Sequence, residues 1–211
     1  MQKSQNGCGN AVIWLEKVAD ANKKTAPKMI STEFPELKTD RLLLRQFNEH
    51  DLENVFKGLS HPDIIQYYGV SYQTLEDTQE QMKFFADLEW TGTGIWWAVC
   101  SLDNQTFYGA GGLNNLSKAH KKAEIGFWLL TDFWGKGIMT EAMPLICDYG
   151  FAQLGLHRIE GFVETDNTNC KNAMAKLKFQ HEGTMQDCEI KEGRFISLDI
   201  YAKIRNTPSH S

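Results

Sequence analysis

Two glycines flank a lysine in the stretch FWGKG, which covers residues 133–137 and separates two apolar runs. The run before it, AEIGFWLL, favours a strand, and the run after it, IMTEAMPLICDYGFAQL, favours a helix. The first backbone N–H groups of a helix have no partners within the helix, and glycines let the preceding loop approach a ligand closely. The loop can therefore bind an anion such as a pyrophosphate, with Lys136 adding a positive charge.

The two best-known nucleotide-binding loops do not fit this stretch. In a P-loop, G-x-x-x-x-G-K-[ST], the hydroxyl residue follows the lysine directly, but here Thr140 lies too far away and the first glycine is missing. The dinucleotide pattern G-x-G-x-x-G needs a third glycine where Thr140 stands. On spacing alone, a tight turn into a helix explains the loop as well as an anion site does.

The cysteines and histidines show no pattern of a metal site or a disulfide framework. Five cysteines and six histidines are widely spread, without a C-x-x-C or H-x-x-x-H pair. We therefore expect no bound metal and no structural disulfide, and reduced, partly buried thiols as in a cytoplasmic protein. The cysteines are Cys8, Cys100, Cys147, Cys170 and Cys188.

The composition is that of an ordinary globular protein without a strong electrostatic bias. The 211 residues carry a formal net charge of −5, with 42% hydrophobic and 23% charged residues. This balance argues against a general binder of nucleic acid or of anionic membranes. No apolar run approaches the length of a membrane span, and AVIWL near the N-terminus is too short for a signal peptide. We expect a cytoplasmic protein with no nucleic-acid or membrane partner.

Strand-like and helix-like segments alternate from Thr39 onward, and residues 61–69 are expected only to connect two helices. The helix after Thr74 begins with acidic residues, so Thr74 is expected to be its N-cap. The expected strands cover residues 41–47, 95–102, 107–116, 123–130, 157–165, 179–190 and 194–204, and the expected helices cover residues 48–60, 74–90, 138–154 and 168–179.

The order of these elements predicts an α/β fold of the α+β type. Three consecutive strands in the middle of the chain favour antiparallel pairing, whereas the crossover through the long helix favours one parallel pair. A mixed, mostly antiparallel central sheet with helices on both faces satisfies both conditions. The last two strands are expected to form a hairpin through KEG at residues 191–193.

The first residues differ in character from the rest of the chain. We expect residues 1–36 to be an extension with at most one short helix, residues 37–205 to be the functional domain and residues 206–211 to fray. Met29 opens a stretch that would be a sensible protein start by itself, so residues 1–28 are expected to be dispensable for folding.

FWGKGIMTEAM resembles the acetyl-CoA loop of the Gcn5-related N-acetyltransferases (GNAT), in which Q/R-x-x-G-x-G/A is common. Trp134 takes the Gln/Arg position, Gly137 the first glycine and Met139 the final Gly/Ala, so two of the three positions depart from the pattern. The letters WGKG and TEA are closer to the RimJ/RimL-like branch, which acetylates ribosomal-protein N-termini. LKTDRLLLRQF, AEIGFWLL and DYGFAQLGLHRIEGFVETDNTNCKNAMAKLKF also resemble that branch, from about residue 37 to residue 204.

The resemblance implies a GNAT fold in which a splayed pair of strands holds acetyl-CoA as the cosubstrate. The pyrophosphate would bind the glycine loop, and the thioester arm would lie beside residues 128–130, where a free backbone N–H would bind the thioester oxygen. Asn167 would hydrogen-bond the arm, and a helix N-cap or an Asx-turn is its alternative role. The expected acetyl-CoA-binding residues are Trp128, Leu129, Leu130, Trp134, Gly135, Lys136, Gly137, Ile138, Met139, Thr140 and Asn167.

Acetyl transfer to an amine also needs acid–base groups. Glu124 is the candidate base, because it shares a strand face with Gly126, which leaves room for a substrate; an ion pair with a residue such as Arg158 is the alternative. Cys170 stands where the family usually has serine and is the candidate proton donor, with a half-buried helical cysteine as the alternative. Lys178 replaces a family glycine, so it must adopt a left-handed conformation or the helix must end differently.

The acceptor is expected to bind where the family places its acceptor loop, which here contains Tyr67 and Tyr68, whereas Trp96 and Trp97 are expected in the core. The resemblance implies an N-acetyltransferase that transfers acetyl from acetyl-CoA to a primary amine, on a protein N-terminus or a small molecule, by direct attack in a ternary complex. A homodimer is compatible with it. The alternatives are a non-catalytic acyl-CoA-binding sensor or interaction module and a binder of a different nucleotide.

Overall fold

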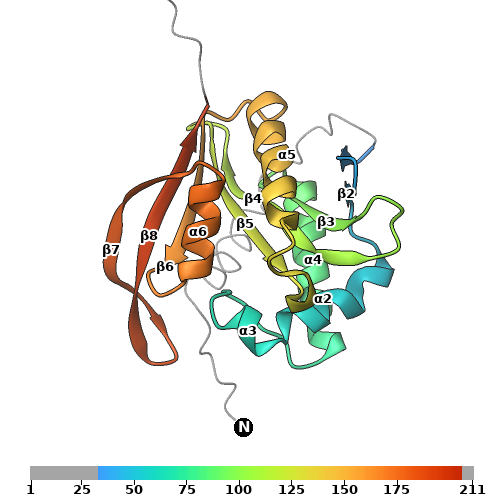
Figure 1. The fold of residues 1–211 in the computed structure, drawn as a ribbon, viewed down its shortest axis with the longest axis horizontal. Coiled ribbons are helices and arrows are strands. Elements are labelled where there is room, and N and C mark those ends of the chain that lie inside the picture. The colour runs from blue at the N-terminus through green and yellow to red at the C-terminus, as the bar shows by residue number, and fades with distance from the viewer. Residues whose placement is uncertain (1–32, 206–211) are drawn as a thin grey trace, which may run out of the picture.

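The structure, a computed structural model, describes residues 33–205, which form a mixed sheet with helices on both faces (Figure 1). The strands are β1 (Leu37–Lys38), β2 (Leu42–Arg45), β3 (Ile95–Ser101), β4 (Phe107–Ser117), β5 (Lys122–Leu129), β6 (Arg158–Glu164), β7 (Gln180–Lys191) and β8 (Arg194–Ile204). The helices are α2 (Leu52–Leu59), α3 (Pro62–Ile65), α4 (Leu75–Thr91), α5 (Ile138–Ala152) and α6 (Thr168–Lys176), with short 3-10 turns η1 (Glu49–Asp51) and η2 (Thr131–Phe133).

The sheet order is β1-β2-β3-β4-β5-β6-β8-β7, and every neighbouring pair is antiparallel except β5 and β6. The parallel pair is joined by the long helix α5, as the sequence predicted. The mixed, mostly antiparallel sheet is thus confirmed. Figure 1 shows α6 and α5 in front of the sheet, with the ribbon of α4 behind it.

The parallel pair is short, and this shapes the centre of the molecule. Strands β5 and β6 pair only at Lys122 to Glu124 with Arg158 to Glu160, although both strands continue further. Beyond this point β5 remains paired with β4 and β6 with β8. The two strands therefore diverge, opening toward the bottom of the view in Figure 1, and each leaves one edge without a strand partner.

Each face of the sheet carries its own hydrophobic core, because successive side chains on a strand point to opposite faces. Trp97 belongs to the core under α5 and α6, and its neighbour Trp96 belongs to the core under α2 and α4. Both indoles are buried, which confirms the expected core role of the two residues.

Local signals in the sequence set the helix starts. Thr74 caps α4 through a bond from the backbone N–H of Asp77, as predicted. Asn48 forms a capping box with Asp51, but this box opens the 3-10 turn η1, and α2 starts only at Leu52. Residues 61–69, expected to be only a connection, contain the one-turn helix α3, whose N-terminus has a proline.

Helix α6 ends in the left-handed conformation that a non-glycine residue rarely adopts. Lys178 has φ 61°. Its N–H donates to the carbonyl of Ala175, and the N–H of Phe179 donates to the carbonyl of Met174, both at 3.0 Å. These two bonds define a Schellman motif. The first of the two outcomes expected for Lys178 is therefore observed.

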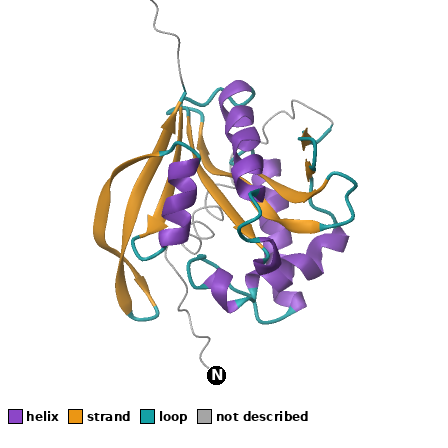
Figure 2. Cartoon of the chain, in the orientation of Figure 1, coloured by secondary structure: helices purple, strands orange, loops and turns teal. Residues whose placement is uncertain are grey.

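Strands β7 and β8 form a long hairpin that extends away from most of the helices, at the left of Figure 2. Its turn uses Glu192 and Gly193, with φ 49° and 76°, which suits the right-handed twist of the strands. The pairing shifts register twice, between His181 and Gly183 and between Met185 and Glu189.

Residues 33–36, which the sequence placed in the extension, pack onto the domain. Phe34 meets the ring of Trp97 edge-on at a centroid distance of 5.9 Å. The carbonyl of Pro35 accepts a 2.7 Å hydrogen bond from Nε1 of Trp97. The helix expected before residue 28 and the tail after residue 205 lie outside the described residues.

Candidate active site

The glycine loop has the geometry of an anion site. Gly135 and Gly137 have φ 74° and 75°, and Gly137 is the N-cap of α5. Within the described chain, no acceptor is recorded for the backbone N–H groups from Gly135 to Thr140. The exposed side chain of Lys136 lies over the ring of Phe133, 5.3 Å from its centroid. The loop thus combines free N–H donors, the positive end of a helix dipole and a lysine.

A second cation lies at this loop that the sequence did not reveal. Arg41, just before β2, donates from Nη2 to the carbonyl of Lys136 at 3.3 Å. Its Nε pairs with Glu141 in the first turn of α5 at 2.5 Å. A Cβ on Gly137 would lie 3.6 Å from the guanidinium. Arg41 is close to the loop only through the fold, so no motif could have identified it.

The edge of β5 offers backbone groups at alternating residues. Leu130 donates to the carbonyl of Tyr108 on β4, and in an antiparallel ladder Trp128 is then the next residue that bonds to β4. The polar backbone groups of Phe127 and Leu129 therefore point into the opening between β5 and β6. The predicted contact at Leu129 fits this geometry, whereas Trp128 and Leu130 turn their backbones to β4 and bury their side chains.

Trp134 lies at the C-terminal end of the free edge of β5. Its indole Nε1 donates to the carbonyl of Leu129 at 2.9 Å, and its ring is 43% exposed. The side chains of Ile138 and Met139 are buried in the core under α5, so these residues can offer a ligand only their backbone. Thr140 is exposed on the first turn of the helix.

A pocket of about 160 Å³ lies on the β6 side of the opening. Its walls come from the connection after α3, the end of β6, the start of α6 and the β7–β8 hairpin. Residues that line it are Tyr67, Gly69, Phe162, Val163, Glu164, Asn167, Cys170, Glu189, Ile196 and Leu198. Three residues predicted for the site, Tyr67, Asn167 and Cys170, thus meet in one pocket.

Tyr68 is not among them. It packs against the core under α2 and α4, and burial raises the pKa of its hydroxyl well above the usual value. Tyr67 is 38% exposed, and its hydroxyl approaches the carbonyl of Asp166 at 3.5 Å. Of the predicted tyrosine pair, the structure brings only Tyr67 to the pocket.

Asn167 is the N-cap of α6, since its side-chain oxygen accepts a 3.0 Å bond from the N–H of Cys170. The alternative role considered for it is therefore observed, and its amide nitrogen stays available at the pocket. Burial raises the pKa of the Cys170 thiol to about 12. The thiol is thus protonated at neutral pH, as a proton donor must be, but it releases its proton less readily than an exposed thiol.

Glu124 lies where β5 and β6 are still paired, opposite Glu160. Burial raises the pKa of the Glu124 carboxyl, and the nearby Glu160 and Glu189 add to this effect, against a hydrogen bond with Asn115. Among the described residues Glu124 has no ion pair, and Arg158 pairs with Glu160 instead. The alternative considered for Glu124 therefore does not hold.

The space expected at Gly126 is filled. A Cβ at this position would lie 2.7 Å from the ring of Trp96, so the indole already covers the glycine. Glycine at this position allows Trp96 to pack against the strand, and the substrate room predicted there is wrong. Any acceptor must approach Glu124 from the direction of Glu160 and Glu189.

The chain has the sequence signature of a known family. The acetyltransferase (GNAT) domain model matches residues 41–180. The N-acetyltransferase YoaA of Bacillus subtilis is 32% identical over 82% of this chain and 98% of the relative. The chain belongs to the GNAT acetyltransferases. It is an acetyl-CoA-dependent N-acetyltransferase.

A solved structure of similar fold and a further relative differ in the acceptors that their names give. The structure of RimL, a ribosomal L7/L12 alpha-N-protein acetyltransferase in complex with coenzyme A, has a TM-score of 0.72 at 20% identity over 81% of this chain and 98% of that chain. Spermidine N(1)-acetyltransferase of Escherichia coli (strain K12) is 32% identical over 35% of this chain and 39% of the relative. The first likeness concerns the fold alone.

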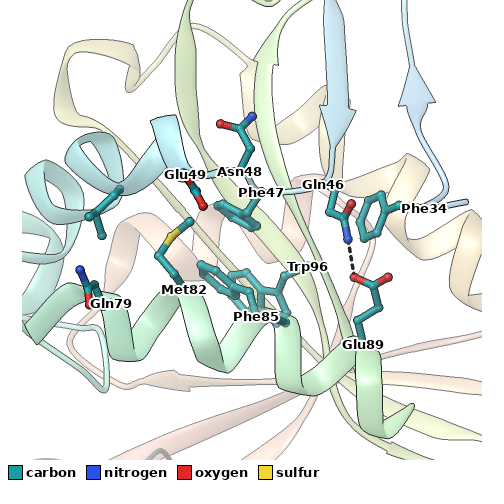
Figure 3. Close-up of a pocket in the computed structure, with 12 residues that line it drawn as sticks. Phe34, Gln46, Phe47, Asn48, Glu49, Gln79, Met82, Phe85, Glu89 and Trp96 are labelled. Carbon is teal, nitrogen blue, oxygen red and sulfur yellow. Dashed lines mark hydrogen bonds between the residues drawn. The ribbon is translucent and has the colours of Figure 1, made fainter. Parts of the chain in front are cut away.

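A larger pocket of this GNAT domain, about 540 Å³, lies between α4 and the segment after β2 (Figure 3). Phe47, Phe85 and Trp96 form its apolar wall, and Gln46 donates to Glu89 at its rim at 2.9 Å. The ring of Trp96, which lines this pocket, also covers Gly126.

Between residues 33 and 205, no three or more histidine, cysteine, aspartate or glutamate side chains are grouped as metal ligands. None of the helices described over the same range is long and apolar enough to cross a membrane.

Proposed function

We propose that this chain transfers the acetyl group of acetyl-CoA to a primary amine by direct attack in a ternary complex. One observation carries the proposal: the opening between β5 and β6 lies between the glycine loop and a pocket beside unpaired carboxylates. A cosubstrate with an anionic head and an extended arm fits the first part of this path, and a cationic acceptor fits the last.

The glycine loop and the edge of β5 would each bind a different part of the cosubstrate. The N–H groups from Gly135 to Thr140 and the cations of Arg41 and Lys136 suit the pyrophosphate. The backbone groups of Phe127 and the N–H of Leu129 suit the amide-bearing arm, which would take the place of a strand partner. In this arrangement the backbone N–H of Leu129 donates to the thioester oxygen as it gains negative charge.

Starting from an ammonium, the transfer removes two protons from the nitrogen and supplies one to the sulfur. Glu124 takes a proton from the acceptor ammonium, directly or through water, and the resulting neutral nitrogen forms its bond to the acetyl carbon. The carbon–sulfur bond breaks, the sulfur leaves as a thiolate, and the nitrogen of the new amide loses its second proton to water. Cys170 remains the proposed donor to this thiolate, although its raised pKa makes it a weak acid.

The acceptor that we propose carries a positive charge near neutral pH, as a protein N-terminus or an alkylamine does. Glu189 lines the pocket and has no ion pair among the described residues, so its carboxylate can bind the charge of the acceptor. The known acceptors of the two relatives, a ribosomal protein and spermidine, are both amines. Unpaired thiols at Cys100, Cys147, Cys170 and Cys188 favour the reducing cytoplasm as the location.

Release of free thiol from acetyl-CoA, followed over time with a panel of amines, tests the proposal. The panel contains N-terminal peptides, alkylamines, polyamines and amino acids. We expect sustained release that depends on at least one amine, together with the acetylated product by mass spectrometry. Tight binding of coenzyme A without turnover on any amine would favour the sensor instead, and protection from unfolding by ATP or NAD but not by coenzyme A would favour another nucleotide.

A further inference from the structure

Four carboxylates lie on one side of the sheet around the acceptor pocket. Residues opposite each other in a ladder share a face, so Glu124 and Glu160 face the same way, and Glu164 follows on the same face of β6. Leu198, opposite Glu164, and Ile196, opposite Glu189, extend this face to the hairpin.

Two of the four carboxylates are neutralised by cations of this chain. Glu160 is buried and pairs with Lys122 at 2.6 Å and with Arg158 at 2.7 Å. Glu164 pairs with Lys191, and both side chains are largely buried, with exposed fractions of 16% and 15%. Glu124 and Glu189 have no ion pair with any residue between 33 and 205.

Lys191 holds three walls of the pocket together. It lies at the end of β7, beside the hairpin turn, and its ammonium contacts Glu164 at the end of β6. The same ammonium donates to the carbonyl of Gln66 and lies 5.7 Å from the centroid of the Tyr67 ring. An aromatic face, a carboxylate and a carbonyl are the groups that would bind the ammonium of a bound amine.

We propose that Lys191 occupies the position of a second acceptor ammonium and thereby selects acceptors with one amino group at the pocket over diamines and polyamines. With Lys191 in place, Glu189 alone is left to bind a charged amine, because Glu164 already has its partner. This inference rests on the proposed function, and it separates the two acceptor classes that the relatives represent. Lys191 would be a specificity-determining residue that acts through Glu164.

The test replaces Lys191 with Met and compares butylamine with 1,4-diaminobutane, which share a carbon chain and differ by one ammonium. The ratio of kcat/KM for the diamine to that for the monoamine should rise about tenfold in Lys191→Met, since a close charge pair is gained. Lys191→Arg, which keeps the charge, should keep the wild-type ratio.

Lys203 offers a matched control. Its ammonium also donates to a carbonyl, that of Leu177 at 3.1 Å, and lies 5.7 Å from the centroid of the Phe179 ring, outside the pocket. Lys203→Met should leave the diamine preference unchanged. The double variant Lys191→Met/Glu164→Gln should lose the gain of Lys191→Met, because the released carboxylate is gone.

A purely structural role of Lys191 would lower kcat/KM for both amines by the same factor, and an unchanged ratio would overturn the proposal while leaving the acetyltransferase function in place. If the wild type acetylated no amine, the proposed function would fall. Calorimetric titration of the same two amines into the coenzyme A complex of wild type and Lys191→Met then decides the inference, since equal relative affinities would refute it.

Discussion

At the residue scale, Glu124 and Glu160 show how neighbouring carboxylates acquire different roles. They are opposite each other on β5 and β6. Glu160 pairs with Lys122 and Arg158, and these cations lower its carboxyl pKa despite burial. Glu124 has no ion pair with any described residue, and burial raises its pKa, against the weaker effect of the nearby Lys122.

We expect Glu124→Gln to lower kcat about a hundredfold at neutral pH, since a positioned base contributes roughly that factor or more. Because the pKa of Glu124 is raised above the ordinary 4.5, its basic form is lost at acid pH and gained as the pH rises. The wild-type rate should therefore increase with pH through this pKa, and the variant should lack that limb. Glu182→Gln, which removes an exposed carboxylate bound to Arg158, serves as control and should keep the limb.

Single residues also mark the limit of prediction from the sequence. The backbone position of Leu129, the thiol of Cys170 and the ring of Tyr67 were expected from the family resemblance, which assigns roles to these strand, helix and loop positions. Arg41 and Lys191 could not be predicted, because each reaches the site from a distant part of the chain. The space at Gly126 was misjudged because Trp96 comes from β3, which β4 separates from β5 in the sheet.

At the element scale, the start of α5 is set by two left-handed glycines and the end of α6 by a left-handed lysine. A residue with a side chain loses about 1–2 kcal/mol of conformational free energy in this conformation. Glycine avoids this cost in the loop before α5, whereas Lys178 bears it at the end of α6. The start of α4 was predicted from its Thr74 cap, whereas α2 starts later than predicted because the capping box of Asn48 opens η1. The one-turn helix α3 was not predicted, because four residues carry too little periodicity.

Gly137→Val should weaken coenzyme A binding at least tenfold, because a branched residue resists φ 75° at the N-cap and turns the N–H groups of the loop. Gly92, with φ 64° after α4 and nothing within 4 Å of its added Cβ, is the matched control. Both valine variants should lose stability, but only Gly137→Val should lose affinity in a calorimetric titration. Unchanged affinity would remove the loop from the cosubstrate site.

Lys178→Gly should raise the free energy of unfolding by about 0.5–1 kcal/mol, because glycine relieves the left-handed conformation at a small cost in chain entropy. For a chain of this size, that is a gain of roughly 1–4 °C in Tm. Ala175→Gly, at an exposed position inside α6, should instead lower Tm. A loss of stability in Lys178→Gly would show that the lysine side chain has a structural role.

At the scale of the whole molecule, the sheet is continuous at one end and divided at the other. The order of the elements was sufficient to predict the mixed sheet and its single parallel crossover. The length of the β5–β6 pairing could not be derived from the sequence, since both strands continue with apolar residues beyond Glu124 and Glu160. The splay was expected from the resemblance alone.

Two truncations test where the domain begins. Removal of residues 1–28 should leave Tm unchanged, because the stretch that opens at Met29 would be a sensible protein start by itself. Removal of residues 1–36 also takes away Phe34 and the Pro35 carbonyl, which leaves Nε1 of the buried Trp97 without its acceptor. That loss should cost about 1–3 kcal/mol, measured by denaturant unfolding. Equal stability of both truncations would contradict the packing role of residues 33–36.

The two register shifts in β7 have a consequence beyond the pocket. Strand β7 is the outer edge of the sheet and, at 12 residues, is long enough to recruit a strand from another molecule, whereas the opposite edge strand β1 has only 2 residues. The shifts interrupt the row of backbone donors and acceptors along β7. Charged residues such as Glu182 and Asp187 also lie on this strand. Edge-to-edge aggregation of nascent or crowded copies is therefore disfavoured, and straightening β7 would create an amyloid-prone surface.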